Sequence, residues 1–430
     1  REAGETSLTD AIAAARSRVL RAGEHMATLM SDPTSSPYHE VHLRSALRLR
    51  TLCEVNKGVY IKLGQHLGQL DYLLPPEYID TLKTMFANNP VSPTEFILRV
   101  IEEDTGRTAD QLWANFNPVP IASASLAQVH VATGSDGRRY AVKVQHEGLL
   151  EASKGDLIAI TVLANIVSWL FKDFDYGWLV KEINFNLPRE LDFRLEAQNA
   201  HRAAGLLQGD DVVIPDVYIA TPRVLCMSFE EGCFVSNTAE LQRNDIRCGD
   251  VARLISKTFS EQMFIHGFVH CDPHIGNLLV RPHPQHPGKP QLVLLDHGLY
   301  RDLTEDFRRS YTRLWAALLS SNVPDIAKYC EELNVGEAYP LMASVLTFRS
   351  WDDITSKDLA RFVSFCSVMR FNNKGTNTES EVLRGYAHKY IGEIIKLLGE
   401  VPADLLLVLK TNDCLRHLDK ALGAPVNSAI

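Results

Sequence analysis

The feature that most constrains the fold is a change in the spacing of apolar side chains between residues 118 and 145. The helical spacing of the flanking segments gives way there to alternation, which is typical of β-strands. The alternating apolar residues are Val129, Val131, Ala141 and Val144. They flank the run Gly134-Ser135-Asp136-Gly137, whose composition is typical of a turn. The sequence therefore predicts a β-hairpin inside a largely helical chain.

The elements after this hairpin are predicted in a definite order. We expect helices near residues 151–208, strands near 212–229, a helix from about Cys248 to Gly267, a short strand pair, and helices beyond Thr304. The run from Gln285 to Pro290, with prolines around it, is typical of a loop that joins the two paired strands. This order predicts an α+β protein in which a small sheet-containing lobe precedes a helical lobe.

Two helices are predicted before the hairpin, over about Leu8–Met30 and Val41–Leu70, and Pro75-Pro76 would end the second. Residues 11–62 carry eight basic and four acidic side chains, so this stretch is locally basic. A helix face of this charge could contact an anionic lipid surface, but the favoured interpretation is an ordinary solvated helix face beside an acidic protein.

Composition narrows the class of protein. The formal net charge of −9 argues against a long nucleic-acid contact surface, which needs clustered Lys and Arg. The eight cysteines include no C-x-x-C pair, which disfavours a zinc ribbon or a disulfide knot and leaves the compartment open. The most apolar run, Leu157–Phe171, is shorter than the roughly 20 residues that cross a bilayer, so we expect a buried helix there. A targeting segment or membrane anchor before Arg1 stays open.

Residues 270–277 read His-Cys-Asp-Pro-His-Ile-Gly-Asn. Asp272 follows His270 by two residues and Asn277 follows Asp272 by five, which is the spacing of a kinase catalytic loop. A carboxylate at Asp272 can orient or accept the proton of an acceptor group. The amide oxygen of Asn277 can bind a metal ion without adding negative charge beside phosphates. We therefore predict Asp272 as a catalytic residue and Asn277 as a metal ligand.

A second carboxylate lies nineteen residues after Asn277. The apolar strand 292–295 delivers Asp296-His297-Gly298, a strand-end carboxylate followed by a glycine at which the backbone can turn. This resembles the D-F-G metal-binding turn. Since Mg²⁺ prefers hard oxygen ligands, Asp296 and Asn277 are predicted to hold it together with nucleotide phosphates.

Lys143 closes the run Tyr140-Ala141-Val142-Lys143, which ends the hairpin as the V-A-I-K strand of kinases does. Its ammonium group would hold the α- and β-phosphates, and Glu196 is a candidate carboxylate partner for it. We therefore predict both as residues of a nucleotide site, with Lys143 also counted as catalytic.

Residues 122–129 overlay the glycine-rich loop pattern G-x-G-x-x-G-x-V with alanine at all three glycine positions. A Cβ at these positions restricts positive-φ conformations and narrows the approach of backbone amides to phosphates. Alone, the run fits an ordinary strand start. Its register with Lys143 favours a nucleotide-binding loop formed by Ala122, Ser123, Ala124 and Ser125.

These residues together resemble the UbiB-like, aarF-domain atypical kinases, a coenzyme Q-associated family, over about residues 50–300. The motifs that carry the resemblance are Lys62-Leu63-Gly64-Gln65, the alanine-rich loop with Gln128-Val129-His130, Lys143, Glu190-Leu191-Asp192-Phe193, the H-x-D-x-H-x-x-N loop and the Asp296 turn. Runs at 60–66, 295–300 and 409–413 (Leu-Lys-Thr-Asn-Asp) look like the mitochondrial subgroup called aarF-domain-containing kinase one. The chain departs from the pattern at His297, where most members carry Phe, and at Ile275, where Pro is usual.

The resemblance implies a protein-kinase-like bilobal fold in three parts. Residues 1–117 would form an N-terminal helical extension with the K-x-G-Q motif packed over the active site. Residues 118–232 would form a kinase-like N-lobe with a helical insertion, and residues 233–430 a helical C-lobe. It also implies that Lys62, counted as catalytic, pairs with Glu190 or Asp192, and that Glu196 holds Lys143. The residues counted as binding the nucleotide then include Gln65, Glu190 and Asp192.

The implied function is Mg²⁺-dependent phosphoryl transfer from ATP to water, a lipid or a small acceptor, with ATP or ADP as the bound nucleotide. The family further implies a setting at the mitochondrial inner membrane, membrane lipid or inner-membrane proteins as partners, and a part in coenzyme Q or lipid homeostasis. The acceptor and the oligomeric state stay open.

Two other functions fit part of the sequence. His266, His270 and His274 are spaced by four, as zinc ligands on a helix can be, although Gly267 and Pro273 interrupt such a helix. The stronger alternative is a nucleotide-binding, pseudokinase-like regulator or lipid-handling scaffold with little catalysis, because a covering helix would obstruct peptide substrates.

Overall fold

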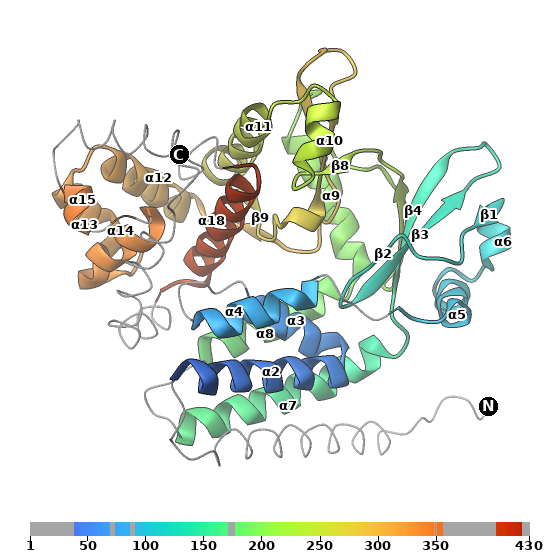
Figure 1. Ribbon diagram of the computed structural model, residues 1–430, viewed down its shortest axis with the longest axis horizontal. Helices are drawn as coiled ribbons and strands as arrows, with labels where there is room; N and C mark the ends of the chain where they lie inside the picture. Colours follow the sequence, from blue (N-terminus) through green and yellow to red (C-terminus); the bar gives the residue numbers. More distant parts are fainter. Residues whose placement is uncertain are drawn as a thin grey trace. The chain divides into compact units, whose positions relative to one another are not determined.

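The computed structural model describes residues 38–68, 74–86, 91–170, 177–347, 349, 351–355 and 401–423. The chain divides into two compact units, residues 1–197 with 216–229 and residues 198–215 with 230–430, and each is described by itself (Figure 1). The helix predicted over Leu8–Met30, with its basic residues, lies outside the described residues.

The first unit combines an antiparallel sheet with helices. Its strands are β1 (Asn115–Phe116), β2 (Ala122–Ser123), β3 (Ala127–Thr133), β4 (Arg139–Gln145), β6 (Val217–Ala220) and β7 (Val224–Ser228). Its helices are α2 (Tyr38–Asn56), α3 (Gly58–Leu67), α4 (Pro76–Lys83) with the short η1 (Thr84–Phe86), α5 (Thr94–Thr105), α6 (Ala109–Leu112), α7 (Leu149–Leu170), α8 (Gly177–Glu190) and the start of α9 (Phe193–Leu206).

The predicted hairpin is confirmed as β3 and β4. These strands pair antiparallel from Ala127 opposite Gln145 to Thr133 opposite Arg139, and the turn between them has Gly137 at φ 77°. The strand order is β1-β3-β4-β7-β6, with β2 also paired to β3, so β4 lies in the middle of the sheet. A central strand has both backbone edges hydrogen-bonded, which holds its side chains in fixed positions.

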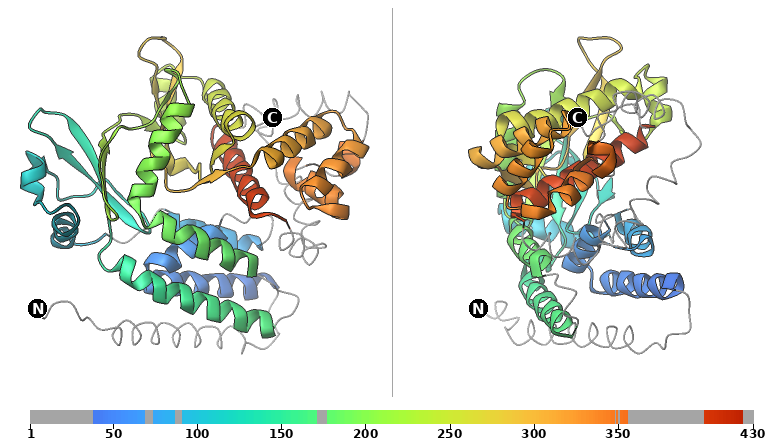
Figure 2. Two further views of the ribbon diagram at one scale, coloured as in Figure 1. Left: turned by 180° about the vertical axis from the view of Figure 1, so that it is seen from behind. Right: turned by 90° about the vertical axis from the view of Figure 1, so that its left-hand side faces the viewer.

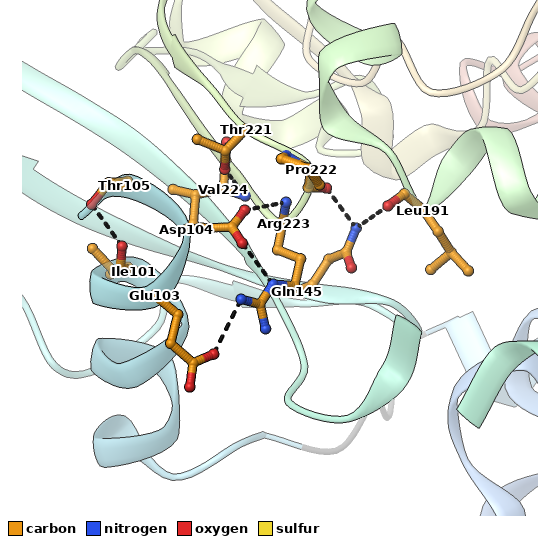
Figure 3. Close-up of polar contacts among 10 residues, drawn as sticks. All are labelled: Ile101, Glu103, Asp104, Thr105, Gln145, Leu191, Thr221, Pro222, Arg223 and Val224. Carbon is orange, nitrogen blue, oxygen red and sulfur yellow. Dashed lines mark hydrogen bonds and ion pairs between the residues drawn. The ribbon is translucent and has the colours of Figure 1, made fainter. Parts of the chain in front are cut away.

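One face of the sheet is covered by α5. Val142 and Val144 of β4 are fully buried in a cluster with Ile97 and Val100 of that helix. Polar contacts at the end of α5 add to this packing: the Arg223 backbone N–H and Nε each donate to the Asp104 carboxylate at 2.8 Å (Figure 3). The opposite face of the sheet, which carries Lys143, is thereby left for other contacts.

The single helix predicted over Val41–Leu70 is wrong, because the chain breaks at Lys57-Gly58 into α2 and α3. Both residues have left-handed backbone angles, φ 59° and φ 46°. A Cβ at Gly58 would lie 2.6 Å from Leu149 Cδ1, so glycine permits both the angle and the close approach of α7. Apolar spacing continues through the break, and periodicity alone therefore does not reveal it.

The helix predicted over Leu157–Phe171 is present as far as Leu170, where the described residues end, but the prediction that it is buried is wrong. Residues 157–170 belong to α7, which packs against α3 and α8, while Ile158 and Trp169 are 66% and 77% exposed (Figure 2). Within the ranges that the structure describes, no helix is long and apolar enough to cross a membrane.

The second unit contains two small sheets and helices. Its strands are β5 (Val212–Val213), β8 (Cys233–Phe234), β9 (Phe268–His270), β10 (Leu278–Pro282), β11 (Pro290–Leu294) and β12 (Tyr300–Asp302). Its helices are the end of α9, α10 (Thr238–Arg243), α11 (Cys248–Ser260), η2 (Glu261–His266), η3 (Ile275–Asn277), α12 (Glu305–Leu319), α13 (Val323–Glu332), η4 (Gly336–Ala338), α14 (Tyr339–Thr347), α15 (Trp351–Thr355) and α18 (Ala403–Ala421).

The described strands of this unit pair in two sheets. The four-stranded sheet has the order β5-β11-β10-β8, and β9 pairs antiparallel with β12. The predicted strand pair around the loop Gln285–Pro290 is confirmed as β10 and β11. The described residues after Thr304 are helical apart from their connections, as predicted, and the Thr304 hydroxyl caps α12 by accepting from the Phe307 N–H.

Candidate functional site

The ion pair expected between Lys143 and Glu196 is present in the first unit. Lys143 Nζ lies 2.7 Å from Glu196 Oε1 and 2.9 Å from Oε2, and the ammonium stands 5.1 Å above the ring centre of Phe193. The strand alternation of β4 turns Val142 and Val144 toward α5 and Lys143 the opposite way. Glu196 lies in the first turn of α9, where the helix dipole favours a carboxylate.

The alanine-rich loop is a tight hairpin. Ala122 and Ser123 form β2 and pair with Val129 and Gln128 of β3, and the Ala124 N–H donates to the Ala127 carbonyl at 2.8 Å. None of these residues has a positive φ. The loop is therefore built from conformations that alanine accepts, in agreement with the restriction predicted from its missing glycines.

Two side chains tie this loop to neighbouring elements. His146 Nε2 donates to the Ala124 carbonyl at 3.0 Å, and its Nδ1 accepts from the Ser92 hydroxyl at 2.8 Å. Burial lowers the pKa of His146, with a smaller contribution from the charge of Lys57, which suits this neutral tautomer. The Ser125 hydroxyl donates to Gln65 Oε1 at 3.2 Å.

Lys62 and Gln65 of α3 are inside the unit rather than in solvent. Lys62 Nζ lies 2.8 Å from Glu190 Oε2, with side chains only 15% and 7% exposed. Gln65 Nε2 donates to the Met85 carbonyl at 3.1 Å while its oxygen accepts from Ser125. Lys62 and Gln65 are therefore not solvated side chains of a surface helix, and their contacts supply the partners that a buried charge and a buried amide need.

Gly64 allows α3 to pack closely against Met85 of η1 and Cys53 of α2. A Cβ there would lie 2.7 Å from Met85 Sδ and 3.2 Å from Cys53 Sγ. Only glycine lets the helix approach the η1 segment, and this approach brings Gln65 within reach of the Met85 carbonyl.

Of the two carboxylates offered as partners of Lys62, the structure selects Glu190. Asp192 instead accepts from Arg194 Nη2 at 2.7 Å and from the Arg194 backbone N–H at 3.1 Å. These hydrogen bonds, which are the largest influence, hold the pKa of Asp192 below its usual range. The turn between the two acids is fixed by Gln145 at the end of β4, whose Nε2 donates to the Leu191 carbonyl at 2.8 Å (Figure 3).

The second unit holds the residues predicted to form a catalytic loop. His270 ends β9, and its buried ring accepts the Asp272 backbone N–H on Nδ1 at 3.0 Å. Burial, opposed by the charges of Asp296 and Asp272, lowers the pKa of His270, so the neutral ring can act as this acceptor. The Asn277 amide donates to the Asp272 carbonyl at 3.1 Å. The loop is thereby closed on itself around Asp272.

Asn277 and Asp296 lie at one end of the β10–β11 hairpin. Leu278 pairs with Leu294, and the Leu295 N–H donates to the Asn277 carbonyl at 2.9 Å, so the residues flanking both strands are neighbours. The Gly298 N–H donates to Asp296 Oδ1 at 2.9 Å and turns the chain.

This donor set fits Mg²⁺. The Asn277 NH₂ group donates to the Asp272 carbonyl, so the amide oxygen is the atom that could bind a metal ion, and Asp296 could add a carboxylate. Among the described residues no group of three His, Cys, Asp or Glu side chains could hold a metal ion. Two protein oxygens are nevertheless what Mg²⁺ uses when substrate phosphates and water complete its shell.

His297, the residue at which the chain departs from the D-F-G pattern, is buried. Its Nε2 donates to the Leu294 carbonyl at 3.1 Å, its Nδ1 accepts from the Tyr300 hydroxyl at 3.0 Å, and its carbonyl accepts from Asn199 at 2.9 Å. The ring of His297 thus makes two hydrogen bonds that a phenylalanine ring could not make.

The zinc alternative is not supported by this geometry. His266 ends the η2 turn and His270 lies in strand β9, with Gly267 between them at φ 64°. Residues on a bent helix end and a strand do not share one helical face, which the spacing of four requires.

One residue near Asp272 was missed by the sequence analysis. Lys410, on α18, has its Nζ 3.3 Å from Asp272 Oδ1. The run Leu-Lys-Thr-Asn-Asp was noted only as a subgroup resemblance. A signal for a site role was available, because the run puts a lysine on an otherwise apolar helix stretch, Leu405 to Leu409.

Comparison with known proteins agrees with the fold and the motifs. The model of the ABC1 atypical kinase-like domain matches residues 84–330. AarF domain-containing protein kinase 1 of Gallus gallus is 44% identical over 386 residues, covering 89% of this chain and 72% of the relative. Its namesake in Mus musculus is 42% identical over 408 residues, covering 93% and 75%.

Among solved structures, the Rv3197–erythromycin complex from Mycobacterium tuberculosis has a TM-score of 0.53 at 21% identity. The match covers 91% of this chain and 93% of that one, and it supports the same fold. The α+β, kinase-like fold predicted from the sequence is thus confirmed. The chain belongs to the ABC1, or AarF-domain, family of atypical kinase-like proteins.

Proposed function

We propose that this protein binds MgATP and transfers its γ-phosphoryl group to water, a lipid or a small acceptor. The observation that carries the proposal is the arrangement in the second unit, where Asp272 lies in a closed loop and Asn277 and Asp296 adjoin at one hairpin end. Phosphoryl transfer requires a carboxylate that orients the acceptor and oxygen ligands that hold the metal ion, and these three side chains can supply them.

Each residue has a separate task in this proposal. Asn277 and Asp296 would hold Mg²⁺, which when bound neutralises phosphate charge. Lys143, kept extended by Glu196, would meet the α- and β-phosphates. The residues of the alanine-rich loop, Ala122 to Ser125, would line the nucleotide from the β2–β3 side.

Asp272 would orient the acceptor oxygen. In the transfer the bond between the γ-phosphorus and the bridging oxygen breaks, and its electron pair leaves with ADP. A bond forms from the acceptor oxygen to phosphorus, and the acceptor proton passes to the Asp272 carboxylate and then to solvent.

The contacts of α3 favour a small acceptor over a protein. Lys62 pairs with Glu190 while Gln65 reaches Ser125 in the alanine-rich loop, so the K-x-G-Q helix is fastened to the loop that would contact nucleotide. In this proposal Lys62 and Glu190 hold the helix in place, and Asp192 serves the turn through Arg194.

The same fastened helix favours a second function, that of a nucleotide-binding regulator with little turnover. By family membership we further propose a setting at the mitochondrial inner membrane and a part in coenzyme Q or lipid homeostasis. Cosedimentation with liposomes that contain anionic lipid, at low and high salt, tests the membrane contact: salt-sensitive binding supports it, and equal recovery without liposomes opposes it.

A single-turnover assay of phosphate release tests the main proposal. The wild-type chain should release phosphate from ATP in the presence of Mg²⁺, with and without added membranes. Asp272→Asn should slow release by about 10²- to 10⁴-fold, the usual range for a lost acid–base group, while leaving nucleotide binding intact. Binding without release in the wild-type chain would favour the regulator, and an equal rate in the variant would remove Asp272 from the mechanism.

A further inference from the structure

Asp272 has a buried cation beside it that comes from the far end of the chain. Lys410 Nζ lies 3.3 Å from Asp272 Oδ1, and the side chains are 11% and 13% exposed. Lysine is rarely buried unless its charge is paired, because an unpaired ammonium loses its hydration. The ion pair therefore makes the burial of Lys410 possible, and Asp272 gains a fixed positive neighbour.

The helix that carries Lys410 is fastened on both sides of it. Arg301 Nε donates to Asp404 at 2.5 Å before it, and the Asn412 amide donates to the Tyr311 hydroxyl at 3.0 Å just after it. Arg416 further along donates to the Leu346 carbonyl. The position of Lys410 is thus fixed by α18, which is itself held in place by these hydrogen bonds.

The proposed reaction creates a need for such a cation. Asp272 would be an anion next to a phosphoryl group whose oxygens are also negative, and this repulsion opposes the approach of acceptor and phosphate. The next ring in the loop, His274, uses its Nδ1 to accept from the Gly276 N–H and so serves the turn. A positive group held beside Asp272 offsets the repulsion at no cost of reorganisation during the reaction.

We propose that Lys410 is a positioning residue for phosphoryl transfer, which holds the Asp272 carboxylate in one orientation and compensates its charge. This inference rests on the proposed function. Lys410 exchanges neither a proton nor an electron pair in the step. The proton of the acceptor still goes to Asp272, and the leaving electron pair still goes to ADP.

The test compares variants of the full chain in single-turnover phosphate release, in MgATP affinity and in thermal stability. Lys410→Met should lower the maximal rate about 10- to 100-fold and leave the dissociation constant for MgATP within about twofold, because the change is on the acceptor side. Lys410→Arg should restore part of the rate, since it returns the charge with a different geometry. Asn412→Ala, which removes a neighbouring anchor without touching Asp272, should keep the wild-type rate.

A double variant separates coupling from a general structural effect. Lys410→Met combined with Asp272→Asn removes both charges of this ion pair, so the double variant should fold and be no slower than Asp272→Asn alone. A further loss in the double variant, a wild-type rate in Lys410→Met, or an equal loss in Asn412→Ala would overturn the inference. Turnover that needs Asp272 but not Lys410 would defeat this inference alone. Absence of turnover in the wild-type chain would defeat the proposed function and this role with it.

Discussion

Lys143 Nζ lies within 2.9 Å of both carboxylate oxygens of Glu196, and the two side chains are 14% and 4% exposed. The pair joins the central strand β4 to the first turn of α9. A buried ion pair of this kind is costly to break on one side, because the remaining charge keeps its desolvation penalty without its partner.

Lys143→Met is therefore expected to lower the free energy of unfolding by about 3–5 kcal/mol. Lys143→Met with Glu196→Gln should recover a large part of that loss, because neither buried charge remains. Urea unfolding of the wild-type chain, of Lys143→Met, of Glu196→Gln and of the double variant gives the coupling energy. Equal stabilities for Lys143→Met and the double variant would contradict the prediction. Lys143→Met and the double variant are both expected to bind nucleotide more weakly than the wild-type chain.

Asp296→Asn is expected to weaken Mg²⁺-dependent nucleotide binding with little change in the stability of the protein alone. The substitution removes a charge but scarcely alters the volume, and the amide oxygen can still accept from the Gly298 N–H. The increase in melting temperature caused by MgATP should fall, while the melting temperature without ligand stays near that of the wild type. An unchanged MgATP effect would exclude Asp296 from the metal site.

Gly64→Ala is expected to destabilise the protein by about 1–3 kcal/mol, the usual cost of an overpacked methyl group. The added Cβ would meet Met85 Sδ at 2.7 Å, and α3 would have to move away from the segment that accepts from Gln65. Met85→Ala should relieve the contact, so the double variant should lose less than the sum of the single losses. Additive losses, measured by urea unfolding, would show that the Met85 contact is not the cause.

A pH dependence follows from His146. Its pKa lies below the ordinary value of 6.5 in the folded protein, so the unfolded chain binds the proton first as pH falls through 6.5. The contribution of His146 to the free energy of unfolding is thus fully present above pH 6.5 and is lost as the pH falls below it. His146→Gln, which can still donate to the Ala124 carbonyl, should make this loss shallower by at most about 1.4 kcal/mol per pH unit, the limit for one proton.

Urea unfolding at pH 7.5 and 5.5 measures this effect. His130 and His270 have pKa values lowered by burial in the same direction, so the variant should keep part of the acid sensitivity. An identical pH dependence in the wild type and His146→Gln would show that His146 is protonated equally in both states.

The two incorrect helix predictions have a common origin. Apolar spacing predicts which residues of a helix face its neighbours. It does not predict where the backbone leaves helical dihedral angles, or how much of the helix surface its neighbours cover. Lys57-Gly58 breaks a continuous apolar pattern because α7 approaches there. Ile158 and Trp169 stay exposed because the partners of α7 cover only one side of it.

Local patterns in the sequence were sufficient for the hairpin β3–β4, the loop from His270 to Asn277 and the turn at Asp296. Their hydrogen bonds join residues close in the sequence, two positions apart in the loop and the turn and at most eighteen in the hairpin, so the residue types and their spacing already specify them. Tertiary packing alone decided that Lys62 meets Glu190 rather than Asp192, and that Lys410 meets Asp272. Those partners are far apart in the chain, and the choice among similar carboxylates depends on distances and burial that arise only when helices pack.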